Sequence, residues 1–472
     1  MKHILLPLFL LLALSACDKQ LSDINVNPNA TENPQPHFLL TGVLKQGADL
    51  YWGLNSSFGS SLLFVQHWAK IQYAEADRFE FSNSSSEITT LWNTAYASLI
   101  TDLNTILAFP VEIAGNGYKG IARTLRVWVF LLLTDTYGDI PYREAGRSLV
   151  PAYDPQRDVY LGLLEELSQA VELLADAQET ISGDVVYNGD LHRWLRLSYS
   201  LKLRIALRIA DREEEIARQT VAALPLDELI ASNLDNFAFI YTNSPQHNPQ
   251  AAAFDTRDDY RISATLVNTL TELNDPRLTV YAQHPDDLPN DYVGARNGLS
   301  NGEAAAQGFS RTSRPGLFFL APNAPAVFYT YSELLFNLAE AAARGFIDRH
   351  PDDFYRQAIE ASLAQFGISQ EATQAYLQQE AVLYDPTDFR RAIGLQKWIA
   401  FFGQGLDAFA EWRRLDYPRL SPGPAAVLNG KIPLRFFYPG AEQSLNFRAW
   451  KNAVDHQGDD LLSTPLWFDT SH

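Results

Sequence analysis

The 472-residue sequence predicts a mostly α-helical protein, built from antiparallel helix pairs with a loop-rich lobe inserted between them. Three observations support this fold class. Apolar residues recur at helical spacing over residues 37–223 and again over 326–412. Residues 224–325 and 413–472 are instead rich in Asn, Asp, Pro and Gly, which favours loops. Clear alternating strands are scarce, so we expect only a small sheet. No strict repeat is visible, so only the rhythm of helix pairs indicates solenoid character.

The predicted helices follow from this periodicity. In residues 118–137, for example, Ile121, Leu125, Trp128 and Leu132 line one face. The lobe contains one convincing short helix, and we expect the last sixty residues to be loop-like. The expected helices are residues 37–69, 88–109, 118–137, 159–175, 190–210, 263–273, 326–345, 352–366, 369–383 and 387–412.

A stripe of arginines runs along the helix predicted at residues 190–210. Its members are Arg193, Arg196, Arg204 and Arg208. Charged residues on one helix face are usually solvated or ion-paired, so we prefer that interpretation to a binding patch.

The only cysteine, Cys17, follows an apolar run near the N-terminus. Residues 4–14 are almost wholly Leu, Ile, Phe and Ala, a length typical of a signal-peptide core and too short to span a bilayer. Leu-Ser-Ala then precedes the cysteine, which completes a bacterial lipobox. We therefore expect Cys17 to carry a lipid. The alternative is a buried free cysteine behind an ordinary cleaved signal.

This assignment sets the expected domain organisation. Residues 1–16 are the lipoprotein signal peptide, and residues 17–36 are a lipidated N-terminus and a Pro- and Asn-rich tether. A single domain follows over residues 37–472. Its helical scaffold is expected at about 37–223 and 326–412, and its loop-rich lobe at about 224–325 and 413–472.

Composition excludes several classes of protein. A formal net charge of −19 and no cluster of Lys and Arg exclude nucleic-acid binding. One cysteine leaves no disulfide framework, so stability has to come from a large core, which 46% hydrophobic residues can supply. After the signal, no apolar run approaches the length of a membrane span, so the lipid is the expected membrane contact.

Patterns typical of catalysis are incomplete. Residues 298–302 spell G-x-S-x-G, but no buried strand precedes Ser300, so we expect no nucleophile there. The histidines are scattered singly, so we expect no metal site and no cofactor. Paired carboxylates of the glycosidase type stay open, because such pairs are assembled in space.

Aromatic residues are abundant, with 9 Trp, 21 Tyr and 27 Phe, many in predicted loops. Sugars and peptides dock on ring faces while amides and guanidiniums fix their orientation. Residues 67–96 and 290–316 combine these side chains, although Trp92 fits the core of a flanking helix equally well. The candidate ligand-binding residues are Tyr73, Arg78, Phe79, Phe81, Trp92, Tyr292, Asn297, Phe309 and Arg311.

Five motifs in order resemble the SusD/RagB family of nutrient-binding outer-membrane lipoproteins, and in particular its second SusD-like group. They are the lipobox, DINVNPN at 23–29, DTYGDIPYREA at 135–145, LFNLAEAAARG at 335–345 and QKWIAFFGQGLDAFAEWRRLDYPRL at 396–420. We interpret the motif at 135–145 and the one at 396–420 as structural. Gly138 and Pro141 are expected to end a helix and turn the chain, and Trp398, Phe402 and Phe409 to pack inward.

The resemblance implies a tetratricopeptide-like scaffold of helix pairs with a ligand site on the loop-rich lobe. It implies that the protein catalyses no reaction. It further implies a permanent partner, a SusC-like TonB-dependent transporter that the lipoprotein covers as a lid. The ligand is an oligosaccharide or, in some members, a peptide. Asp18 follows the lipidated cysteine and in some bacteria retains a lipoprotein in the inner membrane. Lineages rich in this family do not follow that rule, so we expect the outer membrane, extracellular face. Two other classes stay open, a lipid-anchored glycan hydrolase and a helical scaffold that organises envelope proteins.

Overall fold

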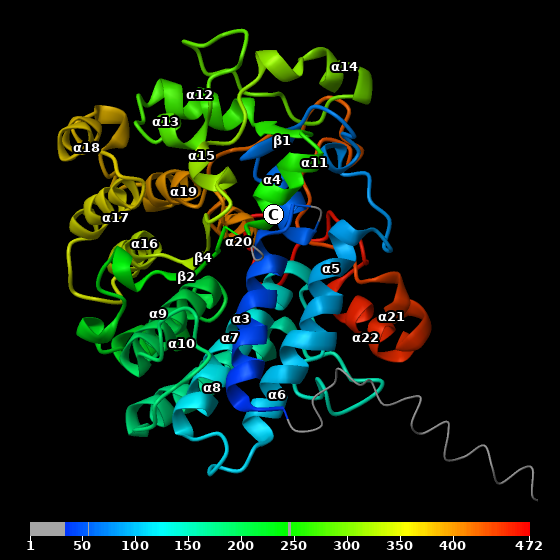
Figure 1. The fold of residues 1–472 in the computed structure, drawn as a ribbon, viewed down its shortest axis with the longest axis vertical. Coiled ribbons are helices and arrows are strands. Elements are labelled where there is room, and N and C mark those ends of the chain that lie inside the picture. The colour runs from blue at the N-terminus through cyan, green and yellow to red at the C-terminus, as the bar shows by residue number, and fades with distance from the viewer. Residues whose placement is uncertain (1–33, 55, 244–246) are drawn as a thin grey trace, which may run out of the picture.

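The computed structural model describes residues 34–54, 56–243 and 247–472, and helices dominate these residues (Figure 1). The predicted mostly α-helical class is confirmed. The predicted signal peptide, Cys17 and nearly all of the tether lie outside the described residues. Within the described ranges, no helix is both long enough and apolar enough to cross a membrane.

The chain enters the fold through two helices that the sequence predicts as one. α3 (Pro36–Trp52) and α4 (Ser57–Phe64) are separated by a turn that includes Gly53 and Leu54. The turn is so tight that a Cβ on Gly59 would lie 1.7 Å from the Leu54 carbonyl oxygen. Apolar periodicity continues through this turn although the helix does not, so the prediction of a single helix is wrong.

Helix pairs form the scaffold. Its helices are α5 (Ser86–Thr94), α6 (Ile100–Ala108), α7 (Asn116–Tyr137), α8 (Gln156–Asp176), α9 (Leu191–Ile209), α10 (Glu214–Ala222), α16 (Tyr331–Ala343), α17 (Pro351–Gln365), α18 (Gln370–Leu377), α19 (Phe389–Ala400) and α20 (Gly405–Leu415). Consecutive helices pack together, α7 on α8, α8 on α9, α16 on α17 and α19 on α20. The helices α6 to α10 fill the lower half of Figure 1, and α16 to α18 lie on its left.

Short elements fill the lobe between α10 and α16. They are β2 (Phe237–Ile240), α11 (Pro249–Thr256), β3 (Tyr260–Ile262), α12 (Ala264–Glu272), α13 (Leu278–Tyr281), α14 (Asn301–Ala306), α15 (Leu317–Leu320) and β4 (Pro325–Tyr329). β4 pairs antiparallel with β2, and β3 with β1 (Trp68–Lys70), which follows α4. The second pair sets Trp68 opposite Ile262 and so ties the lobe to the N-terminal helices.

Helix ends follow glycine and capping residues. α7 stops at Tyr137 because Gly138 takes a φ of 90°, as the motif predicts. The helix predicted over 326–345 begins instead with strand β4, and Thr330 then caps α16. The helix predicted over 387–412 is interrupted near Gly403, whose φ is 85°.

Helices also occur where the sequence predicts only loops. In the lobe they are α11, α13, α14 and α15, and in the C-terminal segment they are α21 (Gly440–Leu445) and α22 (Phe447–Gln457). In α22, Phe447, Trp450 and Val454 recur at helical spacing, and Trp450 and Val454 pack partly buried against the core.

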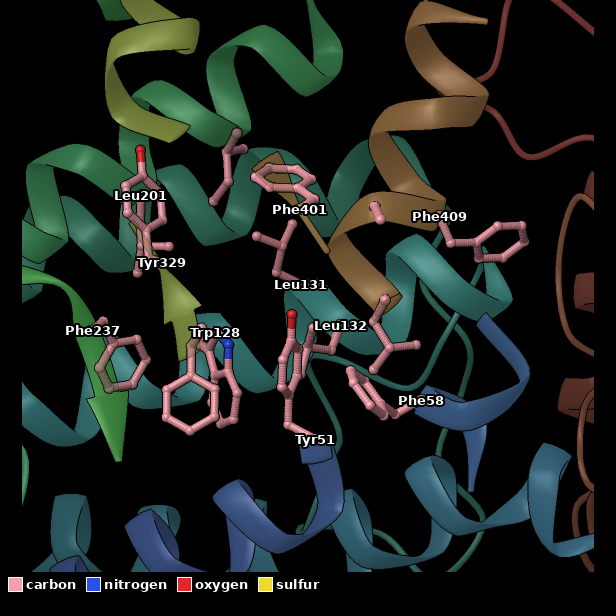
Figure 2. Packing of buried hydrophobic residues seen from close by; sticks show 14 of the residues in the cluster. Tyr51, Phe58, Trp128, Leu131, Leu132, Leu201, Phe237, Tyr329, Phe401 and Phe409 are labelled. Atoms are coloured by element: carbon pink, nitrogen blue, oxygen red, sulfur yellow. The ribbon is translucent and has the colours of Figure 1, made fainter. Parts of the chain in front are cut away.

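The core is aromatic where α3, α7 and the β2–β4 pair meet (Figure 2). The rings of Trp128 and Phe328 have centroids 4.9 Å apart, and those of Phe237 and Phe328 are 4.7 Å apart. Tyr51 meets Phe328 edge-on at 5.3 Å. Burying one large apolar side chain contributes roughly 1.5–3 kcal/mol, so this cluster holds the strand pair firmly on the scaffold.

The arginine stripe on α9 is ion-paired, as interpreted, but half of it is buried. Arg204 donates to Glu333 over 2.6 Å and to Asp407 over 2.9 Å. One turn on, Arg208 lies 2.7 Å from Glu411. Both arginine side chains are almost fully buried, so the solvated interpretation is wrong for them.

The EWRRLDYP motif supplies the other half of this buried ion network. Arg414 donates to both carboxylate oxygens of Glu340, over 2.5 and 2.6 Å, and to Glu411 over 2.7 Å. Lys397 also donates to Glu411, over 2.5 Å. Burial alone would raise the pKa of Glu340, but Arg414 and Arg344 outweigh it and hold this pKa at about 2. The motif therefore joins helices through charge as well as through apolar packing.

Candidate ligand-binding surface

The two aromatic segments that the sequence singles out meet on the lobe, beside the β1–β3 pair (Figure 1). Two of their rings are exposed, Tyr73 at 52% and Phe309 at 44%. The guanidinium of Arg257 lies 4.6 Å from the centroid of the Tyr73 ring, and that of Arg261 lies 5.3 Å from the Phe309 centroid. We call these four residues the aromatic rim. Each of these exposed rings therefore lies within cation–π distance of a guanidinium.

Carboxylates fix the arginines of the aromatic rim. Asp258 accepts from Arg261 over 2.7 Å and from Arg314 over 3.2 Å. Asp259 lies 3.3 Å from Arg257. Because the guanidiniums are already anchored, little ordering of the rings is needed when a ligand binds.

Asn297 ties the two aromatic segments together. Its amide donates to the Trp68 carbonyl and to Asp77, each over 2.8 Å, and its oxygen accepts from Ser263 over 2.5 Å. Burial raises the pKa of Asp77 to about 6, although hydrogen bonds from Asn297 and the Lys70 amide oppose that rise. A buried carboxyl group therefore lies beneath the surface that the two segments form.

Two predicted ligand residues of this loop, Arg78 and Phe79, are buried. Arg78 donates to Asn301 over 3.1 Å and pairs with Glu80 over 2.7 Å. The Phe79 ring packs edge-on against Phe64, with centroids 5.6 Å apart. These side chains hold the loop in shape below the exposed rings.

The remaining residues of the two segments have mixed surroundings. Phe81 is half-buried against the core. Tyr292 stacks on His284 with centroids 4.2 Å apart, and Arg311 is exposed and donates to a backbone carbonyl of α14 over 2.5 Å. Ser300 caps α14 and donates to Glu303 over 2.6 Å, so its hydroxyl has a structural role. Which of the predicted residues contact a ligand stays a prediction.

Comparison with known proteins then identifies the family. The family model of the second SusD-like family, described as starch-binding and associating with the outer membrane, matches residues 28–439. The chain belongs to this family. As a SusD-like protein it binds nutrients at the outer membrane and is not an enzyme, which excludes the hydrolase alternative.

Solved structures agree with this SusD-like fold. A chitin-binding protein is 27% identical with a TM-score of 0.84, covering 93% of this chain and 100% of its own. A chitin-binding SusD homologue from Flavobacterium johnsoniae is 22% identical with a TM-score of 0.82, covering 93% and 98%. A SusD homologue from Bacteroides uniformis is 24% identical with a TM-score of 0.82, covering 92% and 100%. No curated protein sequence matches the chain significantly.

The SusD-like protein has a second concave surface, which the sequence does not reveal. Two adjoining hollows of about 610 and 490 Å³ lie between the loop after α7 and the helices α21 and α22. Four large apolar side chains around them are exposed, Leu149, Val150, Leu445 and Phe447. We call the two hollows, together with these four side chains, the side groove. The predicted ligand residue Trp92 lines one hollow and is itself buried.

Several polar groups of the side groove already have partners within the protein. Glu144 accepts from the Ala152 amide over 2.9 Å, and Glu442 accepts from the Tyr153 hydroxyl over 2.7 Å. Asn446 donates to a carbonyl of the loop after α7 over 2.8 Å. The groove therefore offers mainly apolar contacts. The two sides of the groove lie about three hundred residues apart in sequence. The only sign of the groove in the sequence is the apolar pair Leu149 and Val150 within a polar loop.

Proposed function

We propose that this SusD-like protein captures an oligosaccharide on the aromatic rim and delivers it to a SusC-like TonB-dependent transporter in the outer membrane. The observation that carries the proposal is the pair of exposed rings, Tyr73 and Phe309, each fixed on an anchored guanidinium. Sugar rings dock their apolar faces on such surfaces. A relative that is 27% identical is described as chitin-binding, which supports a sugar ligand.

The charges around the aromatic rim favour a sugar over a peptide. Arg261 is paired with Asp258, and Arg257 lies beside Asp259. The guanidiniums are therefore engaged by the protein's own carboxylates. A neutral ligand needs no unpaired charge on the protein. A peptide has charged termini and side chains, which require oppositely charged partners.

Isothermal titration calorimetry tests this choice. Chitin oligosaccharides and a mixture of short peptides are titrated separately into the purified protein. We expect saturable binding of the sugar with a dissociation constant in the micromolar to millimolar range, and no heat from the peptides. Saturable binding of the peptides without any binding of sugars would contradict the proposal.

The side groove supports the proposed transporter as the protein partner. Soluble monomers rarely expose several large apolar side chains around one hollow, and such patches usually mark interaction sites. The polar groups between them are internally bonded, which suits apolar protein side chains better than sugar hydroxyls. We therefore assign Leu149 and Leu445 to the transporter contact.

Co-purification from solubilised outer membranes tests this contact. Changing Leu149 and Leu445 to Ser should lower the yield of transporter that is recovered with the protein. Changing Val111 and Ile113 to Ser is the matched control, because both are exposed and neither lines the groove. Equal recovery with both double variants would contradict the assignment.

The lipid at Cys17 completes the proposal and places the protein at the cell surface. The thiol is the only one in the chain and lies before the first described helix. Cys17→Ser should release a folded protein from the membrane, as fractionation and circular dichroism would show. Continued membrane association of a variant that lacks the lipid would contradict the anchor.

A further inference from the structure

A third hollow, of about 660 Å³, lies between α7, α8 and the loop after α7. The two helices lie side by side in the lower half of Figure 1. The lining shares no residue with the aromatic rim or the side groove. Its charged residues are Arg123, Arg126, Arg143, Arg147, Asp158, Glu165 and Glu166. Four cations thus face one hollow in a chain whose formal net charge is −19.

One arginine and one carboxylate form a fixed wall of this hollow. Arg126 donates to both oxygens of the buried Glu166, over 2.7 and 2.5 Å. Its guanidinium also lies 4.9 Å from the Phe130 centroid and 5.5 Å from the Tyr142 centroid. The Tyr142 hydroxyl donates to Glu166 over 3.0 Å. Glu166 is therefore neutralised within the wall and does not oppose an anion in the hollow.

Gly162 shapes the same wall. A Cβ at this position would lie 2.5 Å from the Tyr142 ring, so only glycine lets the ring lie against α8. The tyrosine in turn supports Arg126 from one side. The arginine is thereby preorganised without a ligand.

Other arginines of the hollow keep unused donors. Arg123 lies 3.5 Å from Glu166 without a hydrogen bond, and its Nε is buried without a partner. Arg147 makes no side-chain hydrogen bond or ion pair within residues 34–54, 56–243 and 247–472. Arg143 is held by Asp154 over 2.7 Å and keeps further N–H groups free.

Within the described residues, Asp158 and Glu165, which also line the hollow, form no ion pair with Arg123 or Arg147. Asp158 lies 3.5 Å from Arg143 and 3.7 Å from Arg157, so it is shared between two cations. Glu165 is exposed to solvent on α8. The hollow therefore retains positive charge at Arg123 and Arg147.

We propose that this hollow binds an oxyanion, the carboxylate or sulfate group of an acidic ligand, between Arg123, Arg143 and Arg147. Guanidinium groups match the planar and tetrahedral geometry of such anions through paired N–H donors. The site is independent of the aromatic rim, so it does not rest on the proposed capture of a sugar there.

Calorimetry with two probes tests the site. Sodium sulfate and sodium glucuronate are titrated separately into the full-length protein in chloride buffer of constant ionic strength. We expect saturable binding of at least one probe with a stoichiometry of one. Sulfate alone would identify a tetrahedral oxyanion, glucuronate alone a carboxylate, and either result supports the site.

Paired variants make this test specific. Arg123→Ala combined with Arg147→Ala should weaken binding at least tenfold, while circular dichroism shows an unchanged fold. Arg349→Ala combined with Arg356→Ala removes the same charge at and before α17 and should leave the affinity unchanged. Absence of saturable binding to the unaltered protein, or equal weakening in both double variants, would overturn the proposal.

Discussion

Arg257 of the aromatic rim has surroundings opposite to those of the scaffold arginines. In the scaffold, Arg204 and Arg414 are buried and each donates to two carboxylates. In the rim, Arg257 is exposed and lies 4.6 Å from the centroid of the exposed Tyr73 ring, whereas Arg261 is buried. Removing one partner of a buried ion pair leaves an uncompensated charge, whereas an exposed pair contributes little to stability. The same side chain therefore stabilises the fold in one region and prepares a binding surface in the other.

The largest expected effect comes from breaking the buried network. Arg414→Leu leaves Glu340 and Glu411 without their main partner and should lower the free energy of unfolding by about 4 kcal/mol. Urea denaturation measures this loss. Arg257→Leu is the matched change in the rim and should cost less than about 1 kcal/mol. Equal losses for the two variants would remove the distinction between the regions.

A second comparison sharpens the roles of two aromatic residues in one loop. Phe79 is buried against Phe64, and Tyr73 is exposed. Phe79→Ala should lower the free energy of unfolding by about 3 kcal/mol, because it leaves a cavity. Tyr73→Ala should change it by less than about 0.5 kcal/mol. A large loss with the Tyr73 variant would show that this ring belongs to the core.

A third prediction concerns the buried Asp77 below the rim. Burial raises its pKa to about 6, so between about pH 4 and 6 the folded protein binds a proton that the unfolded chain has released. Stability from this group is complete below about pH 4 and is lost as the pH rises towards 6. Asp77→Asn, which stays neutral, should remove about 2 kcal/mol of this pH dependence.

Urea denaturation at pH 4, 5, 6 and 7 checks this prediction. The difference in unfolding free energy between Asp77→Asn and the unaltered protein should increase with pH in favour of the variant. Asn can still accept the hydrogen bond from Asn297. A difference that is constant with pH would show that Asp77 titrates normally.

The scaffold was largely predictable because apolar spacing reports burial. The helix predicted at 118–137 matches α7 within two residues at its start and ends as expected at Gly138. The split between α3 and α4 was not predictable, because it depends on the contact of Gly59 with a carbonyl. α22 escaped prediction although Phe447, Trp450 and Val454 have helical spacing, because the Pro- and Gly-rich residues of the C-terminal segment indicate loops.

The ligand-binding surface was predictable in location more than in detail. The sequence pointed to two aromatic segments, and the structure brings them together through Asn297. The sequence reasoning missed Arg257, which precedes β3, and Arg261, which lies in β3. Nothing in a single sequence shows which cation lies over which ring. The sequence indicated ion pairing along the arginine stripe of α9 but not its buried carboxylate partners, since Arg204 and Glu333 are far apart along the chain.

The central claim is that the exposed rings of the rim bind the sugar and add little to folding. The most direct measurement is the calorimetric affinity for chitin oligosaccharide of a variant with both Tyr73→Ala and Phe309→Ala, with Phe38→Ala as an exposed control on α3. The double variant should bind at least about tenfold more weakly, a loss near 1.4 kcal/mol, with an unchanged urea midpoint. An affinity equal to that of the unaltered protein would contradict the account.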